Sequence, residues 1–158
     1  MSDEFTVVNG PIADQRPIPG VNAAVYVQPT DFLAPGDLKS EDIQGITIDS
    51  SSTDGRCVGF PFLWPGLVMA RVTGTKLYVP YNPSGHDGSQ YAIGILYDQV
   101  RLTLPLTGTP INAAGKLIQN HGCVLSACYV NALAGAPDEA CRIMLSLVGV
   151  RDWPPQAP

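Results

Sequence analysis

The chain has 158 residues, a formal net charge of −5 and a pI near 4.7, with nine Lys and Arg against fourteen Asp and Glu. The basic residues are scattered, which excludes the clustered positive charge that binding to nucleic-acid phosphates requires. No run approaches the roughly 20 consecutive apolar residues of a membrane span. We therefore expect neither nucleic acid nor a membrane as a partner.

Gly and Pro supply 16 and 15 residues, which favours many short strands and turns in one domain over a helical bundle. Charged residues make up 15% of the chain, below the usual quarter, so more of the surface than normal must be neutral. Neutral surface of this kind is often covered by a partner. The acidic start, Met1 to Glu4, is not followed by a hydrophobic stretch, so we expect no secretory signal and synthesis in the cytoplasm.

Residues 1–42 are predicted to form an extended, proline-rich N-terminal arm. The prolines remove hydrogen-bond donors and push the preceding residues out of the helical region, and no hydrophobic period is sustained. The arm is nevertheless too apolar for a solvated tail, so it should lie on a surface, its own or a partner's. Its candidate contact residues are Phe5, Val7, Val8, Ile12, Ile18, Val21, Val25, Tyr26 and Phe32.

Residues 43–158 are predicted to form a β-rich domain. Ile46 and Ile48 alternate with polar residues in a short strand that ends in the polar loop 50–55. An aromatic loop follows, with Phe60, Phe62 and Trp64. We expect these rings to pack on the domain or to form a surface loop at a trimer contact, with stacking on a sugar or a peptide as an alternative.

The next segment reads as a hairpin and two buried strands. The runs 67–73 and 76–81 flank Gly74-Thr75, which suits a two-residue hairpin turn. The runs 92–104 and 123–130 read as buried strands. The link 105–122 is expected to be a loop with a short extra strand.

One helix is predicted near residues 138–148. Its apolar positions follow the i, i+3, i+4, i+7, i+8 pattern of a core-facing stripe, and they are Ala140, Ile143, Met144, Leu147 and Val148. Asp138 suits the positive end of the helix dipole, and Gly149 suits a left-handed cap. The fold class is therefore mainly β with some helix (α+β).

The search for chemistry is mostly negative. The two histidines, His86 and His121, lie in glycine-flanked polar loops, and Ser84 to Ser89 reads as a solvated turn rather than a catalytic site. The stretch 49–55 lacks the regular acidic ligands of a calcium loop. We expect no catalytic residue, no metal and no cofactor. The four cysteines, Cys57, Cys123, Cys128 and Cys141, form no C-x-x-C pair and are expected to be reduced structural thiols.

Residues 76–96 read K-L-Y-V-P-Y-N-P-S-x-x-D-G-S-Q-x-A-x-G-I-L, and V-N-A at 130–132 precedes the predicted helix. This motif and the order of the predicted elements resemble those of the lambda-type head decoration proteins of tailed phages, over about residues 60–152. The resemblance implies a compact, small β-barrel-like domain with one or two short helices. It also implies homotrimers that bind the major capsid protein on the outside of the expanded head, at threefold and quasi-threefold positions, in a virion made in the host cytoplasm.

Two other functions stay open. One is a carbohydrate-binding or tail-associated β module of a virion, using Phe60, Phe62, Trp64 and Tyr91. The other is a small hydrolase that uses His86 or His121.

Overall fold

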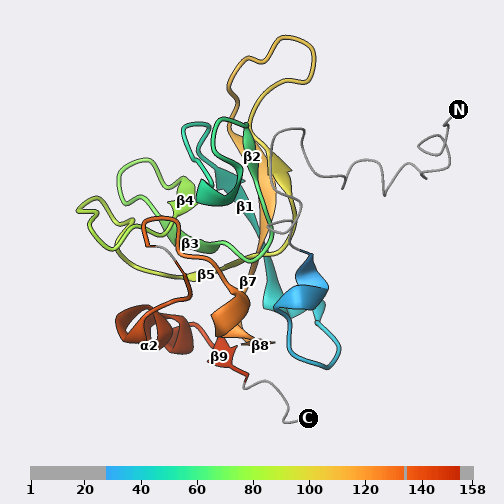
Figure 1. The fold of residues 1–158 in the computed structure, drawn as a ribbon, viewed down its shortest axis with the longest axis vertical. Helices are drawn as coiled ribbons and strands as arrows, with labels where there is room; N and C mark the ends of the chain where they lie inside the picture. The colour runs from blue at the N-terminus through green and yellow to red at the C-terminus, as the bar shows by residue number, and fades with distance from the viewer. Residues whose placement is uncertain (1–27, 134, 154–158) are drawn as a thin grey trace, which may run out of the picture.

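The computed structural model describes residues 28–133 and 135–153, and its centre is a five-stranded closed barrel in the order β1-β4-β3-β5-β7 (Figure 1). Two further strand pairs, β2-β6 and β8-β9, and the helix α2 complete the described fold. The strands are β1 (Ile43–Ile48), β2 (Phe62–Leu63), β3 (Val68–Arg71), β4 (Tyr78–Pro80), β5 (Gly94–Leu96), β6 (Val100–Arg101), β7 (Ala113–Ile118), β8 (Gly122–Cys123) and β9 (Arg151–Asp152). The helix α2 spans Glu139–Leu147, and the 3-10 turns are η3 (Pro29–Asp31), η4 (Ser40–Asp42), η5 (Gly55–Cys57) and η6 (Leu125–Ala127). The predicted mainly β class is confirmed.

The barrel closes mainly through β1 and β7. These two strands pair antiparallel over six residues, from Ile43 opposite Ile118 to Ile48 opposite Ala113. The alternation read in β1 is confirmed, because Ile46 and Ile48 are buried. The expected loop with a short extra strand instead contains β7, which equals β1 in length. Alanine and glycine are poor strand formers, so pairing with β1 rather than local propensity selects this strand.

The hairpin between β3 and β4 is confirmed, but its turn is wider than two residues. Arg71 lies opposite Tyr78, and the Lys76 N–H donates to the Val72 carbonyl oxygen. Lys76 takes the left-handed conformation, with φ of 65°. The chain therefore reverses over residues 73–76, which include the predicted Gly74-Thr75 and end at Lys76.

The two other predicted strands are interrupted. The run 92–104 divides into β5, which belongs to the barrel, and β6, which pairs with β2. The run 123–130 continues as η6 after a strand of two residues, so the prediction of one buried strand there was wrong. Runs rich in apolar residues fit a buried turn as well as a buried strand, which is why the pattern alone misassigned them.

Residues 28–42 pack on the domain. The Phe32 side chain is fully buried, and its carbonyl oxygen accepts a hydrogen bond from the Val124 N–H. Leu33 forms a bridge with Cys123 beside β8. The sequence grouped Phe32 with the partner-contacting arm; that prediction was wrong, because a side chain inside the core cannot reach a partner. The other eight arm residues lie outside the described part of the chain.

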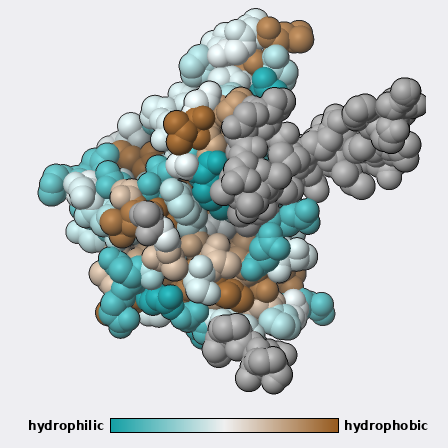
Figure 2. Space-filling view, in the orientation of Figure 1, coloured by the Kyte–Doolittle hydropathy of each residue, from teal (hydrophilic) through white to brown (hydrophobic). Residues whose placement is uncertain are grey.

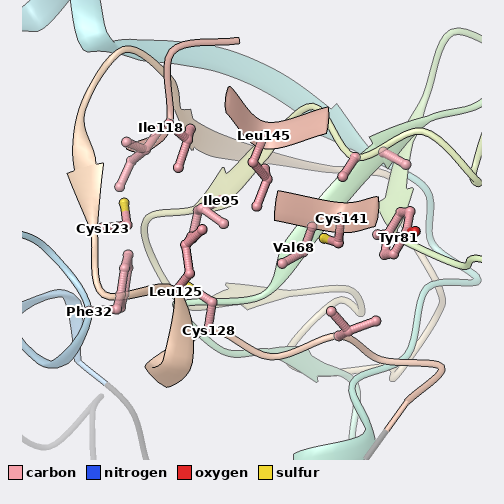
Figure 3. Packing of buried hydrophobic residues seen from close by; sticks show 14 residues of the cluster. Phe32, Val68, Tyr81, Ile95, Ile118, Cys123, Leu125, Cys128, Cys141 and Leu145 are labelled. Carbon is pink, nitrogen blue, oxygen red and sulfur yellow. The ribbon is translucent and has the colours of Figure 1, made fainter. Parts of the chain in front are cut away.

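The core has two clusters of buried side chains. One fills the space between the barrel and α2, and Figure 3 shows Cys141 and Leu145 of the helix pointing toward Val68, Ile95 and Tyr81. The second lies inside the barrel and includes β1, β3 and β7 residues.

The helix α2 begins and ends where predicted, but only part of the predicted stripe packs on the core, namely Met144 and Val148. The Asp138 side chain accepts a hydrogen bond from the Cys141 N–H, and Gly149 has φ of 80°. Leu145 is fully buried, whereas Ile143 is 54% and Leu147 80% exposed. The predicted stripe omitted Cys141, because cysteine was not counted as a small apolar residue. Cys141 is buried together with Leu145, so the face of α2 that packs on the barrel is centred on these two side chains.

We expect Leu145→Ala to lower the free energy of unfolding by about 2–5 kcal/mol, because it leaves a cavity in the core. Leu147→Ala on the same helix is the matched control and should change it by less than about 0.5 kcal/mol. Urea unfolding followed by circular dichroism measures both. Equal losses for the two variants would contradict the orientation of α2.

Candidate interaction surface

A groove with a volume of about 790 Å³ lies between the loop that follows β1 and the hairpin that follows β6. Its lining includes Val58, Phe60, Pro61, Thr103 and Pro110. The groove is open to solvent and mostly apolar, so it offers contact area rather than reactive groups.

The hairpin beside the groove projects from the domain, as the gold loop at the top of Figure 1. Thr103 bridges to Pro110, and the Leu104 N–H donates to the Thr109 carbonyl oxygen at 2.9 Å. Leu106 near its tip is 98% exposed, and Figure 2 shows hydrophobic atoms at this end of the molecule. A large apolar side chain held in solvent is typical of a contact point for another protein.

A buried ion pair shapes the wall of the groove. The Arg56 guanidinium donates to both carboxylate oxygens of Asp54, at 2.7 Å and 3.0 Å, with side-chain exposures of 7% and 0%. It also donates to the carbonyl oxygens of Trp64 and Pro65. The Asp54 carboxylate in turn accepts from the Trp64 N–H. Such a pair is charge-assisted and bidentate, which fixes its geometry.

A second set of contacts ties this loop to the segment after η6. The Arg56 guanidinium lies 5.1 Å from the centre of the Tyr129 ring, and the Gly55 N–H donates to the Asn131 side chain at 2.7 Å. A Cβ on Gly55 would come within 2.5 Å of the Tyr129 hydroxyl oxygen. Glycine is therefore required for the close approach.

The three rings of the predicted aromatic loop separate in space. Phe60 is half-buried and lines the groove. The Arg101 guanidinium lies over the Phe62 ring, 5.4 Å from the ring centre. Trp64 is 1% exposed, which agrees with the expected packing on the domain and rules out the alternative of a surface position for this ring. A buried Trp64 cannot stack on a sugar, and Tyr91 does not line the groove. The rings do not make one carbohydrate platform.

The histidines are not arranged for hydrolysis. The Asp87 carboxylate beside His86 accepts hydrogen bonds from the Ser89 backbone and hydroxyl, which lower its pKa. The His121 Nδ1 lies 4.0 Å from the Asp42 carboxylate at a nearly buried position, and no serine hydroxyl hydrogen-bonds to either ring within the described ranges. In that part of the chain neither histidine is therefore placed to activate a serine hydroxyl.

The cysteines occupy core positions. All four are buried and none is in a disulfide. Burial raises the pKa of the thiols of Cys57, Cys123 and Cys141 to about 12, and it also raises that of Cys128. Across residues 28–133 and 135–153 no three His, Cys, Asp or Glu side chains gather in a way that could hold a metal ion.

The native thiols should therefore be inert. At pH 8 only roughly one in ten thousand thiols with a pKa near 12 is ionised, and the thiolate is the reactive form. We expect no reaction of the native protein with a disulfide reagent such as Ellman's, and four equivalents per chain once urea exposes the thiols. Rapid reaction of any cysteine in the folded protein would contradict the packing described.

We expect Asp54→Asn to lower the free energy of unfolding by about 3–5 kcal/mol, because it leaves the buried Arg56 charge without its counter-ion. Asp37→Asn, at an exposed position, is the control and should change it by less than about 0.5 kcal/mol. Urea unfolding measures both. A loss below about 1 kcal/mol for Asp54→Asn would show that water or rearrangement solvates the guanidinium.

No helix in the described ranges has the length and apolar character needed to cross a membrane. The comparison with individually curated proteins gives no match. A sequence model of the family described as bacteriophage lambda head decoration protein D matches residues 29–127. That range contains all five barrel strands, the aromatic loop and every residue of the groove lining except Asn131, and it is more than half of the 158 residues. The chain belongs to the family of the bacteriophage lambda head decoration protein D.

Proposed function

We propose that this protein binds the outer surface of an expanded phage head as a trimer, at threefold and quasi-threefold positions, and stabilises the shell against the pressure of packaged DNA. The family match over residues 29–127 carries the proposal. The partner is the major capsid protein, and the decoration protein itself is made in the host cytoplasm. The function is binding rather than catalysis, and the apolar side chains exposed on the described domain support it.

The exposed side chains support repeated protein contacts. Val58 in the groove lining is 79% exposed, and Leu106 on the hairpin is 98% exposed. Leu147 on α2 is 80% exposed. A threefold position is matched most simply by a closed ring of heterologous contacts, in which one surface of each copy meets a different surface of the next. Several separate apolar sites on one chain suit such a ring and a capsid contact together.

Stabilisation follows from mass action. A ligand that binds the expanded lattice and not its separated subunits lowers the free energy of the lattice alone. At a thousand times the dissociation constant the gain is about 4.1 kcal/mol per site. Summed over the many equivalent sites of a shell, modest contacts per copy raise the barrier to rupture.

Residues 1–27 are the proposed capsid-contacting arm. Eight apolar side chains remain candidates there, namely Phe5, Val7, Val8, Ile12, Ile18, Val21, Val25 and Tyr26. The prolines in the same stretch reduce the conformational entropy that is lost when an extended segment is fixed on a surface. The order of the chain places the arm just before Gln28, where the described domain begins.

The test is addition of purified protein to expanded heads that lack decoration. We expect saturable binding, density for three copies at each threefold position in cryo-microscopy, and a higher temperature of DNA release. Deletion of residues 2–27 should leave the melting temperature of the free domain unchanged and weaken head binding at least about tenfold, because burial of even one or two of these side chains contributes more than the 1.4 kcal/mol that a factor of ten needs.

Deletion of residues 154–158 is the control for loss of a terminal segment and should bind as the full chain does. Binding without any rise in the release temperature would contradict stabilisation. Density away from the threefold positions would contradict the proposed placement. Unchanged binding after deletion of residues 2–27 would show that the domain surface alone holds the capsid.

A further inference from the structure

The two edges of β1 are unequal. All six residues of β1 pair with β7, but only Ile48 pairs with β4, opposite Tyr78 in parallel register. Residues 43–47 of β1 therefore precede the single contact with β4 that closes the barrel. Along that stretch no other described strand lies against the second edge of β1, so this edge is open.

The direction of each backbone group follows from the ladder. The Gln119 N–H donates to the Asp42 carbonyl oxygen, so even-numbered residues of this stretch face β7. The Asp49 N–H donates to the Tyr78 carbonyl oxygen, so odd-numbered residues face the other side. Gly45 and Thr47 direct their N–H groups to the open edge, and within the described ranges these groups have no hydrogen-bond partner.

The open edge lacks the usual protection. Edge strands of soluble proteins are commonly blunted by a lysine, a proline or a bulge. The sequence of β1 is Ile-Gln-Gly-Ile-Thr-Ile, with no charge and no proline, and its register with β7 is unbroken. A Cβ built on Gly45 meets no atom within 4 Å, so the sheet face at this residue is uncovered. Such an edge can accept an additional strand.

The charges at the two ends of the open edge indicate what kind of strand can pair with it. The exposed Glu41 precedes the open edge and Asp49 follows it. Hydrogen bonds from Ser51 lower the pKa of Asp49, so this carboxylate stays ionised at neutral pH. A second copy of β1 paired antiparallel along residues 43–47 would bring its own Glu41 and Asp49 close to the same two carboxylates at the ends of the edge. Charges of like sign repel, so a segment with basic flanks suits the edge better than a second copy.

We propose that the open edge of β1, at Gly45 and Thr47, docks an extended segment of the major capsid protein by strand addition, with Lys or Arg flanking the paired residues. This inference rests on the proposed function, because it takes the head as the partner. Backbone hydrogen bonds from the edge supply affinity, Gly45 leaves room for a large side chain on the added strand, and the two carboxylates set its charge and register.

The matched variants are Gly45→Pro and Gly45→Ala. Proline removes the outward N–H without touching the β1-β7 ladder, since the residue 45 amide faces away from β7, and its ring enters open space. Alanine adds a Cβ and keeps the N–H. We expect Gly45→Pro to bind expanded heads at least about tenfold more weakly than wild type, and Gly45→Ala to bind within about twofold of it, in a sedimentation assay.

Circular dichroism and urea unfolding establish that each variant is folded. If Gly45→Pro is not, Gly45→Lys replaces it, because a lysine keeps the amide but opposes a basic segment and blocks the edge. Hydrogen exchange adds a direct readout: the Thr47 amide of wild type should exchange freely in solution and become protected on heads.

The outcomes separate the two proposals. If wild type binds heads and Gly45→Pro binds equally well with an unprotected Thr47 amide, strand addition is wrong while the decoration function stands. If wild type does not bind heads, the proposed function itself fails. Protection of Thr47 in free protein, lost together with a change in native mass in Gly45→Pro, would identify a second copy as the occupant and overturn the capsid segment.

Discussion

The buried pair between Asp54 and Arg56 holds together the part of the molecule that has the least regular structure. Between β1 and β3 the described chain runs for nineteen residues with only η5 and the two residues of β2, so most of its backbone polar groups need partners from outside a ladder. The guanidinium and the carboxylate supply several of these partners at once, at the carbonyl oxygens of Trp64 and Pro65 and at the Trp64 N–H. The aromatic contact with Tyr129 then anchors the loop to the segment after η6.

The same pair explains why the groove presents little charge. The charges of Asp54 and Arg56 are neutralised by each other and hydrogen-bonded, so neither is available to a ligand. Apart from Arg101, what faces outward is mostly neutral or apolar, with Val58 and Leu106 well exposed. A domain that needed these side chains for its own stability would bury them. Their exposure agrees with membership of a family that decorates phage heads.

Barrel closure is the second constraint, and between β1 and β4 it rests on a single residue pair. The strand β4 begins only at Tyr78, opposite Ile48, because the residues before it form the turn of the β3-β4 hairpin. It meets β1 through one residue pair only, while β1 continues along β7 for its whole length. The long β1-β7 pairing therefore contributes most of the contact that closes the barrel. The short strand β4 leaves the second edge of β1 exposed. A fold built in this way can be stable alone and still present backbone groups to a partner.

The sequence by itself determined the features that depend on neighbouring residues. The ends of α2 follow from Asp138 and Gly149, and the inward face of β1 follows from the alternation of Ile46 and Ile48. The family follows from the sequence motif at residues 76–96. Helix caps, strand alternation and sequence motifs each depend only on residues that are close together in the chain. Tertiary structure decided the rest. The strand β7 forms from weak strand residues because β1 is there to pair with it, and α2 turns Leu145 rather than Leu147 inward because the barrel offers a seam that includes Cys141. Phe32 and Trp64 look like contact residues in a proline-rich chain, yet both are buried. Their burial depends on surfaces contributed by distant segments, which no local pattern encodes.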